Sequence, residues 1–356
     1  MKARLDRLRS AMEQCGLEAL FVSHPHNRMY MSGFTGTAGY LLITATKAYL
    51  LTDFRYLTQA SEQASYFEVV EHEPKVMGTV KSLLTSLKID HLGFEQQHLS
   101  YAAYREYAAS LGGIRLVPAD PLVERLRMVK DEAEIAVMRE AAELADRTFE
   151  HVVQLLKPGL TERDVAFEIE FFMRKHGATS VSFDTIVASG ERSALPHGKA
   201  SDRVLRPNEF VKLDFGAYYK GYCSDITRTV MLGKPSDRHK QLYDIVLEAQ
   251  MTALEQIKPG MTGKQADAIA REIIEKYGYG DQFGHGTGHG LGLEIHEAPR
   301  LSPQSDTVLE PGMTVTVEPG IYIPGFGGVR IEDDVVVTER GLERLTQATK
   351  QFIIIG

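Results

Sequence analysis

Four acidic residues stand in hydrophobic, strand-like surroundings in the C-terminal part of the sequence. Asp214 and Asp225 flank a turn-like stretch, and Glu318 and Glu332 flank a second turn rich in proline and glycine. If the first hairpin closes around Tyr219-Lys220, Asp214 lies directly opposite Asp225, where like charges destabilise a sheet. Burying unpaired carboxylates is also costly. The pattern predicts a cation between the acids, a protonated acid, or acids that lie on a solvated face.

Three histidines lie between the two acidic pairs, in the glycine-rich run FGHGTGHGLGLEIHE (283–297). They are His285, His289 and His296, and the interspersed glycines oppose a helix but allow a strand or a ligand to come close. One imidazole with several carboxylates suits Mn²⁺, Co²⁺, Fe²⁺ or Zn²⁺. If some carboxylates bridge, this set holds two ions about 3.5–4 Å apart, which activate water for hydrolysis.

The acidic pairs belong to a weak internal repeat. KPGLTERDVAFEIEFFMRKHG (157–177) aligns with KPGMTGKQADAIAREIIEKYG (258–278) at a constant offset of 101, and a threonine stands at the N-cap position of each predicted helix. Asp214 precedes Glu318 by 104 residues, and Asp225 precedes Glu332 by 107. The repeat predicts two similar α/β halves with a site between them; a duplication without a shared site is the alternative.

Ahead of these halves, residues 1–120 alternate helical and extended patterns, which favours an α/β layer. The predicted helix starts with Leu5 to Met12, and the predicted strands are Ala19–Ser23, Tyr40–Thr44, Tyr49–Asp53, Phe67–Glu71 and His91–Glu95. From Leu122 to Leu156 the spacing becomes helical. We therefore expect one domain over residues 1–122 and a second over 123–356.

Composition narrows the class of protein. The chain has 356 residues and a formal net charge of −8, which argues against binding nucleic acid through its phosphates. The N-terminus does not resemble a signal peptide, and no apolar run approaches the ~18 residues of a membrane span. Cys15 and Cys223 are the only cysteines, so a disulfide framework is not expected. We therefore expect a cytoplasmic location, where thiols stay reduced.

The motifs resemble those of the pita-bread dinuclear metallopeptidases, and among them the Xaa-Pro dipeptidase (prolidase) and aminopeptidase P family. The motifs that carry the resemblance are HPHNRMYMSGFTG (24–36), TDFRY (52–56), SALPHG (193–198), LDFGAYYKGYCSDITRT (213–229), HGTGHGLGLEIHE (285–297), VEPGIYI (317–323) and GGVRIEDD (327–334). The resemblance covers nearly the whole chain. It implies a creatinase/prolidase-like N-terminal α/β domain, followed by an α+β pita-bread catalytic domain with a pseudo-two-fold repeat.

The resemblance also implies a role for each matching residue. The implied metal ligands are Asp214, Asp225, His289, Glu318 and Glu332, with Asp225 and Glu332 bridging two divalent ions, for which Mn²⁺ is the expected metal. Glu318 is the implied general base and acid, and a metal-bridging hydroxide attacks the scissile carbonyl. The residues implied to bind substrate or the oxyanion are His197, His285 and His296. Arg330 is implied to orient carboxylates and contact the substrate site, and Thr227 to support Asp225.

The implied substrates are small peptides with proline at the second position. Arg300 matches an arginine of prolidases, and we expect it to bind the carboxylate of a dipeptide, since a guanidinium grips a carboxylate with two parallel bonds. An aminopeptidase P that acts on longer peptides is the main alternative, and a non-catalytic peptide-binding protein is the other. A creatinase-like or methionine aminopeptidase activity is disfavoured by the ligand set and the leading domain. The resemblance further implies a homodimer.

Overall fold

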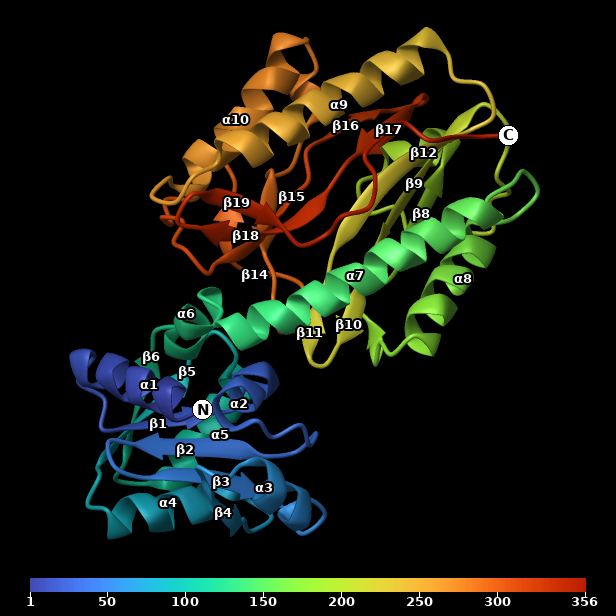
Figure 1. Ribbon diagram of the computed structural model, residues 1–356. Helices are drawn as coiled ribbons and strands as arrows, with labels where there is room; N and C mark the ends of the chain where they lie inside the picture. The colour runs from blue at the N-terminus through green and yellow to red at the C-terminus, as the bar shows by residue number, and fades with distance from the viewer. The chain divides into compact units, whose positions relative to one another are not determined.

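The computed structural model describes every residue of the chain, from Met1 to Gly356. The chain divides into two compact units, Met1–Arg127 and Met128–Gly356 (Figure 1). The sequence predicts the boundary at residue 122, where helix α6 (Leu122–Met128) begins, whereas the structural division falls near the end of that helix. Helix α6 is tied to the first unit, because Asn27 Nδ2 donates to Glu124 Oε1 at 2.7 Å.

The first unit is an α/β layer. Its strands are β1 (Ala19–Val22), β2 (Tyr40–Thr44), β3 (Ala48–Thr52), β4 (Glu68–Glu71), β5 (His91–Glu95) and β6 (Arg115–Ala119), and its helices are α1 (Lys2–Gln14), α2 (Pro25–Ser32), α3 (Leu57–Gln63), α4 (Val76–Ser86), α5 (Tyr101–Leu111) and α6. The strands form one mixed sheet in the order β4-β3-β2-β1-β5-β6. The five predicted strands are confirmed to within one residue at each end. Strand β6 escaped prediction because it contains Pro118, which an edge strand such as β6 tolerates.

The second unit contains four helices and four small sheets. Its helices are α7 (Glu132–Leu155), α8 (Glu162–Lys175), α9 (Asp237–Gln256) and α10 (Gly263–Lys276), with 3-10 turns η1 (Gly190–Ala194) and η2 (Gly280–Gln282). Its strands are β7 (Ser180–Val181), β8 (Ile186–Ser189), β9 (Glu209–Phe215), β10 (Ala217–Tyr219), β11 (Tyr222–Cys223), β12 (Ile226–Leu232), β13 (Gly288–Gly290), β14 (Glu297–Leu301), β15 (Thr314–Val317), β16 (Gly320–Ile323), β17 (Gly327–Arg330), β18 (Asp333–Thr338), β19 (Gly341–Arg344) and β20 (Ile354–Ile355). The two main sheets have the orders β20-β12-β9-β8 and β14-β13-β15-β18-β19.

The second unit repeats one design twice. Helices α8 and α10 follow Thr161 and Thr262, and each threonine completes a capping box with the residue three positions on. Each helix is followed by a glycine with positive φ, Gly177 or Gly278. Helices α7 and α8 pack on the sheet of the first half, and α9 and α10 on that of the second (Figure 1), with a separate hydrophobic core in each half. The predicted repeat is therefore confirmed.

Glycines bring the strands of the second half unusually close together. A Cβ on Gly288 would lie 1.9 Å from the carbonyl oxygen of Thr316, and one on Gly290 would lie 2.3 Å from that of Ala298. Any side chain at these positions would force β13 away from β15 or β14. Within the glycine-rich run, Gly288–Gly290 form strand β13, which carries His289 between two closely approaching neighbours.

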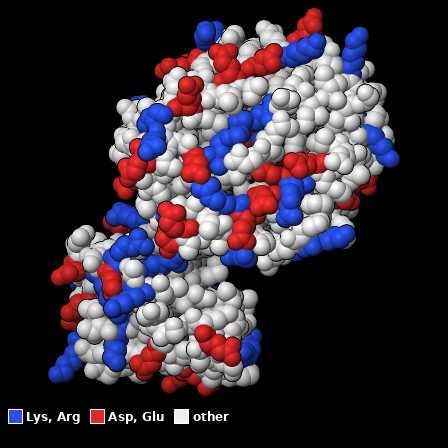
Figure 2. Space-filling view, viewed as in Figure 1, with Lys and Arg blue, Asp and Glu red and all other residues white.

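The surface carries charges of both signs. Lys and Arg side chains are interspersed with Asp and Glu on the visible face of each unit (Figure 2). None of the helices combines the length and the hydropathy that crossing a bilayer requires. Cys15 and Cys223 are both free thiols.

Candidate active site

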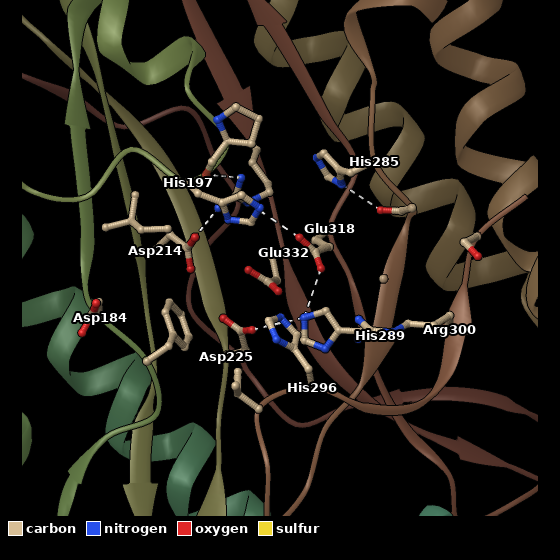
Figure 3. Close-up of a pocket in the computed structure, with 18 of the residues that line it drawn as sticks. Asp184, His197, Asp214, Asp225, His285, His289, His296, Arg300, Glu318 and Glu332 are labelled. Atoms are coloured by element: carbon tan, nitrogen blue, oxygen red, sulfur yellow. Dashed lines mark hydrogen bonds and ion pairs between the residues drawn. The ribbon is translucent and has the colours of Figure 1, made fainter. Parts of the chain in front are cut away.

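The four acidic residues come from corresponding places in the two halves of the second unit. Asp214 lies on β9 and Asp225 just before β12, whereas Glu318 follows β15 and Glu332 precedes β18. Their side chains gather in one pocket (Figure 3). Asp214, Asp225 and Glu332 are buried, with exposed fractions of 5%, 5% and 1%. The alternative that these acids lie on a solvated face is therefore wrong.

The pairing of Asp214 differs from the prediction. Asp214 lies opposite Thr227 rather than Asp225, because the hairpin turns at Lys220-Gly221, where φ is 48° and 89°. Two central residues with positive φ are typical of a type I′ turn, whose twist matches that of the strands. Moving the register by two residues keeps the side chains on the same face. Asp225 is therefore a diagonal neighbour of Asp214, and the two carboxylates still share a face.

His289 enters the acidic cluster from β13. Its Nε2 lies 3.3 Å from Glu318 Oε1 and 3.6 Å from Asp225 Oδ2. Its Nδ1 lies 3.1 Å from the carbonyl oxygen of Gly290, which assigns the ring proton to Nδ1. Burial, reinforced by the charge of His296, lowers the pKa of His289 to about 3. The lone pair of Nε2 therefore faces carboxylate oxygens, an arrangement that is favourable only with a proton or a metal cation between them.

Two further atoms show the same need for a cation. Asp225 Oδ1 and Glu332 Oε1 are buried and have no hydrogen-bond partner, although buried polar atoms normally have one. Asp225, His289 and Glu332 each offer a ligand atom within 4.8 Å of the others. Neutral imidazole and carboxylate are the donor types that divalent first-row metals accept. The residues present therefore fit a divalent metal centre.

Without a cation the carboxylates hold protons tightly. Burial and the charge of Glu332 raise the pKa of Asp225 well above its ordinary value, and burial and the charge of Glu318 do the same to Glu332. The pKa of Glu318 rises to about 7, because burial outweighs the opposing charge of Arg330. Protons and metal ions consequently compete for the same oxygens.

We therefore expect metal affinity to increase with pH. As the pH rises through about 7, Glu318 loses its proton in the metal-free protein, and the competition weakens. Titration calorimetry with Mn²⁺ in buffers of different ionisation enthalpy should detect protons released on binding and a lower apparent Kd at pH 8 than at pH 6. An affinity that is independent of pH, with no proton release, would contradict this expectation.

A threonine and an arginine hold the carboxylates in place. Thr227 Oγ1 donates to Glu332 Oε2 at 2.6 Å, and Arg330 Nε donates to Thr227 Oγ1 at 3.0 Å. Arg330 Nη2 also forms a buried ion pair with Asp214. The predicted support of Asp225 by Thr227 is corrected: the hydroxyl supports Glu332, because the shifted register places Thr227 on the Arg330 side of the site. The arginine orients Asp214 directly and Glu332 through the threonine.

Residues behind the ligands join the two halves, and sequence reasoning missed them. The backbone N–H of Asp225 donates to Asp334 Oδ2 at 2.8 Å, and that of Glu332 donates to the carbonyl oxygen of Thr227 at 3.1 Å. Arg228 donates to the carbonyl oxygen of Glu332 and forms a buried ion pair with Asp333. The acidic run after Glu332 is the signal that could have found the two aspartates.

The pocket has a volume of about 560 Å³ and contains every predicted site residue. Those lining it, besides the metal-ligand candidates, include His197, His285, His296, Arg300 and Arg330 (Figure 3 labels the first four). Phe183, Ile186 and Ile295 add apolar surface to its wall. The His296 ring lies 4.5 Å from that of His289.

His285 differs from the other two histidines of the wall. Its Nδ1 lies 2.8 Å from the carbonyl oxygen of Gly286, and its Nε2 lies 2.8 Å from Tyr322 Oη. Burial and the charge of Arg330 lower its pKa to about 4, so the ring is neutral. Both ring nitrogens are thus engaged within the protein, whereas the His197 side chain makes no such hydrogen bond.

Arg300 lies on β14 directly opposite His289 on β13. Its side chain forms no hydrogen bond or ion pair with the rest of the chain, and it lines the pocket. A guanidinium has five donors and no acceptor, so a pocket that presents one unpaired favours a negatively charged partner.

The two repeated halves and the buried cluster of histidine and carboxylates at their meeting point define a metal-dependent hydrolase with a pita-bread catalytic unit. The comparisons make the class specific. Residues 136–339 match the model of metallopeptidase family M24, and residues 4–129 match the creatinase/prolidase N-terminal domain. The chain belongs to metallopeptidase family M24, a family of metal-dependent peptidases.

Named relatives cover nearly the whole chain. An Xaa-Pro dipeptidase of Pyrococcus furiosus is 42% identical over 99% of this chain and 100% of its own length. Among solved structures, an Xaa-Pro dipeptidase from Bacillus anthracis matches with 53% identity, a TM-score of 0.98 and 99% of each chain covered. An X-Pro aminopeptidase from Thermotoga maritima matches with 43% identity and a TM-score of 0.91, over 97% of this chain and all of its own.

Proposed function

We propose that this chain is a metal-dependent Xaa-Pro dipeptidase, which hydrolyses the bond between the first residue of a dipeptide and the following proline. One observation carries the proposal: a single pocket contains the candidate metal ligands Asp225, His289 and Glu332 and also Arg300, whose side chain has no hydrogen-bond partner. The full-length likeness to chains named Xaa-Pro dipeptidase supports this substrate class.

Two divalent ions, with Mn²⁺ as the first choice and Co²⁺, Zn²⁺ or Fe²⁺ as alternatives, complete the site. The residues that would hold them are Asp214, Asp225, His289, Glu318 and Glu332. Asp225 and Glu332 each have a buried carboxylate oxygen without a hydrogen-bond partner, which would be free to bind an ion. When bound, such ions supply Lewis acidity, which stabilises charge on a carbonyl oxygen and lowers the pKa of water.

Glu318 is the residue suited to moving the proton. Its Oε1 accepts from Thr316 Oγ1 at 3.0 Å, while its Oε2 lies 3.8 Å from Arg330 Nε. Burial raises the pKa of Glu318 to about 7 in the metal-free protein, and its place between Thr316 and Arg330 in the pocket suits this carboxylate to take and return a proton. We assign to Oε2 the proton that passes from water to the proline nitrogen as the bond breaks. His197 and His296, which line the same pocket, are assigned the donation of hydrogen bonds to the substrate carbonyl oxygen.

Proline at the second position suits the rest of the pocket. An Xaa-Pro bond has no N–H, so the enzyme needs no acceptor for one, and the ring is apolar and rigid. Phe183, Ile186 and Ile295 supply an apolar wall for it. Arg300 then binds the carboxylate that follows the ring directly in a dipeptide, but not in a longer peptide.

The test compares Ala-Pro with Ala-Pro-Ala as substrates of the Mn²⁺-loaded protein. We expect hydrolysis of Ala-Pro to be faster, and Arg300→Ala to raise the KM for Ala-Pro by about 10- to 100-fold, because a charge-assisted hydrogen bond is lost. The KM for Ala-Pro-Ala should change little. Arg340→Ala, which removes an exposed arginine outside the pocket, is the matched control.

Each other outcome identifies an alternative. Faster hydrolysis of Ala-Pro-Ala would assign the chain to the aminopeptidases P. A dipeptide preference that survives Arg300→Ala would remove Arg300 from recognition. Binding of Ala-Pro without turnover in Mn²⁺, Co²⁺ or Zn²⁺ would indicate a peptide-binding protein instead of an enzyme.

The remaining assignments follow from the resemblance of the motifs. We propose a homodimer, which sedimentation of the purified protein would test. We also propose a cytoplasmic location, which fits two free thiols.

A further inference from the structure

Lys212 is a fully buried lysine that the proposed chemistry does not use. It lies on β9, two residues before Asp214 and on the same face of the strand, and its exposed fraction is 0%. No carboxylate forms an ion pair with it. Burying a charged ammonium is costly unless acceptors satisfy its donors, so a lysine buried at this position needs hydrogen-bond partners.

The ammonium is satisfied by the backbone of one short segment. Lys212 Nζ donates to the carbonyl oxygens of Ser193, Leu195 and Pro196 at 3.2, 2.6 and 3.3 Å. An ammonium has three N–H donors, and three acceptors engage them all. The ammonium also lies 5.1 Å from the centre of the Tyr322 ring, a favourable cation–π position. Three carbonyl dipoles that converge on one point repel one another unless hydrogen-bond donors lie between them.

This segment carries His197 into the pocket. It runs from the 3-10 turn η1 through Leu195 and Pro196, and the side chain of His197, the next residue, lines the pocket without a hydrogen bond of its own. The direction of that side chain therefore depends on the backbone before it. Arg330 Nη1 also donates to the Pro196 carbonyl, at 3.1 Å. Lys212 and Arg330 thus hold the residue before His197 from two sides.

The second half of the unit uses the equivalent position in a similar way. Thr316 follows Lys212 by 104 residues, the offset that relates Glu318 to Asp214. Thr316 Oγ1 accepts a hydrogen bond from the backbone N–H of His289 at 3.1 Å. In each half, therefore, the residue two positions before an acidic ligand candidate binds the backbone of a segment that carries a pocket histidine.

We propose that Lys212 is a positioning residue, whose ammonium holds residues 193–196 so that His197 meets the substrate. The inference deepens the proposed function and rests on it. Lys212 has no direct role at the metal ions, so its loss should leave metal content intact. The kinetic effect should instead pass through His197.

A double-mutant cycle tests the proposal. Lys212→Met keeps the length of the side chain but removes the charge and the donors. In the Mn²⁺-loaded protein we expect it to lower kcat/KM for Ala-Pro by about 10- to 100-fold, since small misplacements in an active site have effects of that order. In the background of His197→Ala, the same change should lower kcat/KM by less than about threefold, because the group it positions is absent. Lys240→Met, which changes an exposed lysine of α9 outside the pocket, is the control.

The outcomes separate the proposal from its alternatives. An equal fall in both backgrounds, a loss of bound Mn²⁺, or an unchanged kcat/KM in the folded variant would each overturn the role of Lys212. If Lys212→Met does not fold, Lys212→Gln, which keeps an amide donor, enters the same cycle with the same criteria. The wild-type rate on Ala-Pro, measured alongside, tests the dipeptidase assignment separately.

Discussion

Glu318→Gln should reduce kcat for Ala-Pro by about 10²–10⁴-fold, the contribution typical of general acid–base catalysis. The amide keeps the shape of the side chain and can still accept from Thr316, but it cannot take up a proton. Its position in the pocket, beside the other ligand candidates, is what suits Glu318 to this task. Steady-state kinetics at saturating Mn²⁺ measure the change.

Two accompanying measurements make the result decisive. Because Glu318 is also a ligand candidate, the Mn²⁺ content of the variant has to be determined beside its rate. Glu310→Gln, which changes an exposed glutamate outside the pocket, should retain the wild-type kcat. A Glu318→Gln enzyme with full kcat would exclude Glu318 as the proton carrier.

Removal of metal should have the other large effect. After dialysis against a chelator, hydrolysis of Ala-Pro should fall to the background rate and return when Mn²⁺ is added. A ligand at about 100 times its Kd stabilises the native state by about 2.7 kcal/mol, so the midpoint of thermal unfolding should rise by roughly 5–10 °C on re-addition. Calorimetric scans with and without Mn²⁺ provide the measurement.

Asp225→Asn tests whether the stabilisation comes from the bound ion and not from removing the chelator. The substitution replaces a buried carboxyl group whose charged form is costly in the metal-free protein, because burial and the charge of Glu332 raise the pKa of Asp225 well above its ordinary value. The metal-free variant should therefore be at least as stable as the metal-free wild type, while its gain on adding Mn²⁺ shrinks. Activity that persists in wild-type protein shown to contain no metal would contradict the metal-dependent mechanism.

The sequence predicted best what depends on local chemistry. Thr161 and Thr262 cap their helices as expected, since capping depends on residues within one turn. The acids at matched offsets meet in one pocket, because a repeated sequence folds into repeated halves. Their individual roles as ligands, and that of Arg300, stay predictions.

Features set by backbone geometry or by distant contacts could not be predicted. The hairpin register depends on Lys220 adopting positive φ, which few residues other than glycine, asparagine and aspartate do readily. Because the register differs from the predicted one, Thr227 donates to Glu332 and not to Asp225. Lys212 looks like an ordinary polar residue of a strand, and its three carbonyl partners lie 16 to 19 positions earlier in the chain.

The bonds directly behind the ligands bear on how a peptide enters. The backbone N–H of Asp225 donates to Asp334, and that of Glu332 donates to the carbonyl oxygen of Thr227. Arg228 donates to the carbonyl oxygen of Glu332, so hydrogen bonds join the two halves directly beneath the ligand candidates. A hinge motion that separated the two halves would break these hydrogen bonds and move the carboxylates apart. We therefore expect peptides to enter and leave the pocket without a hinge motion between the two halves.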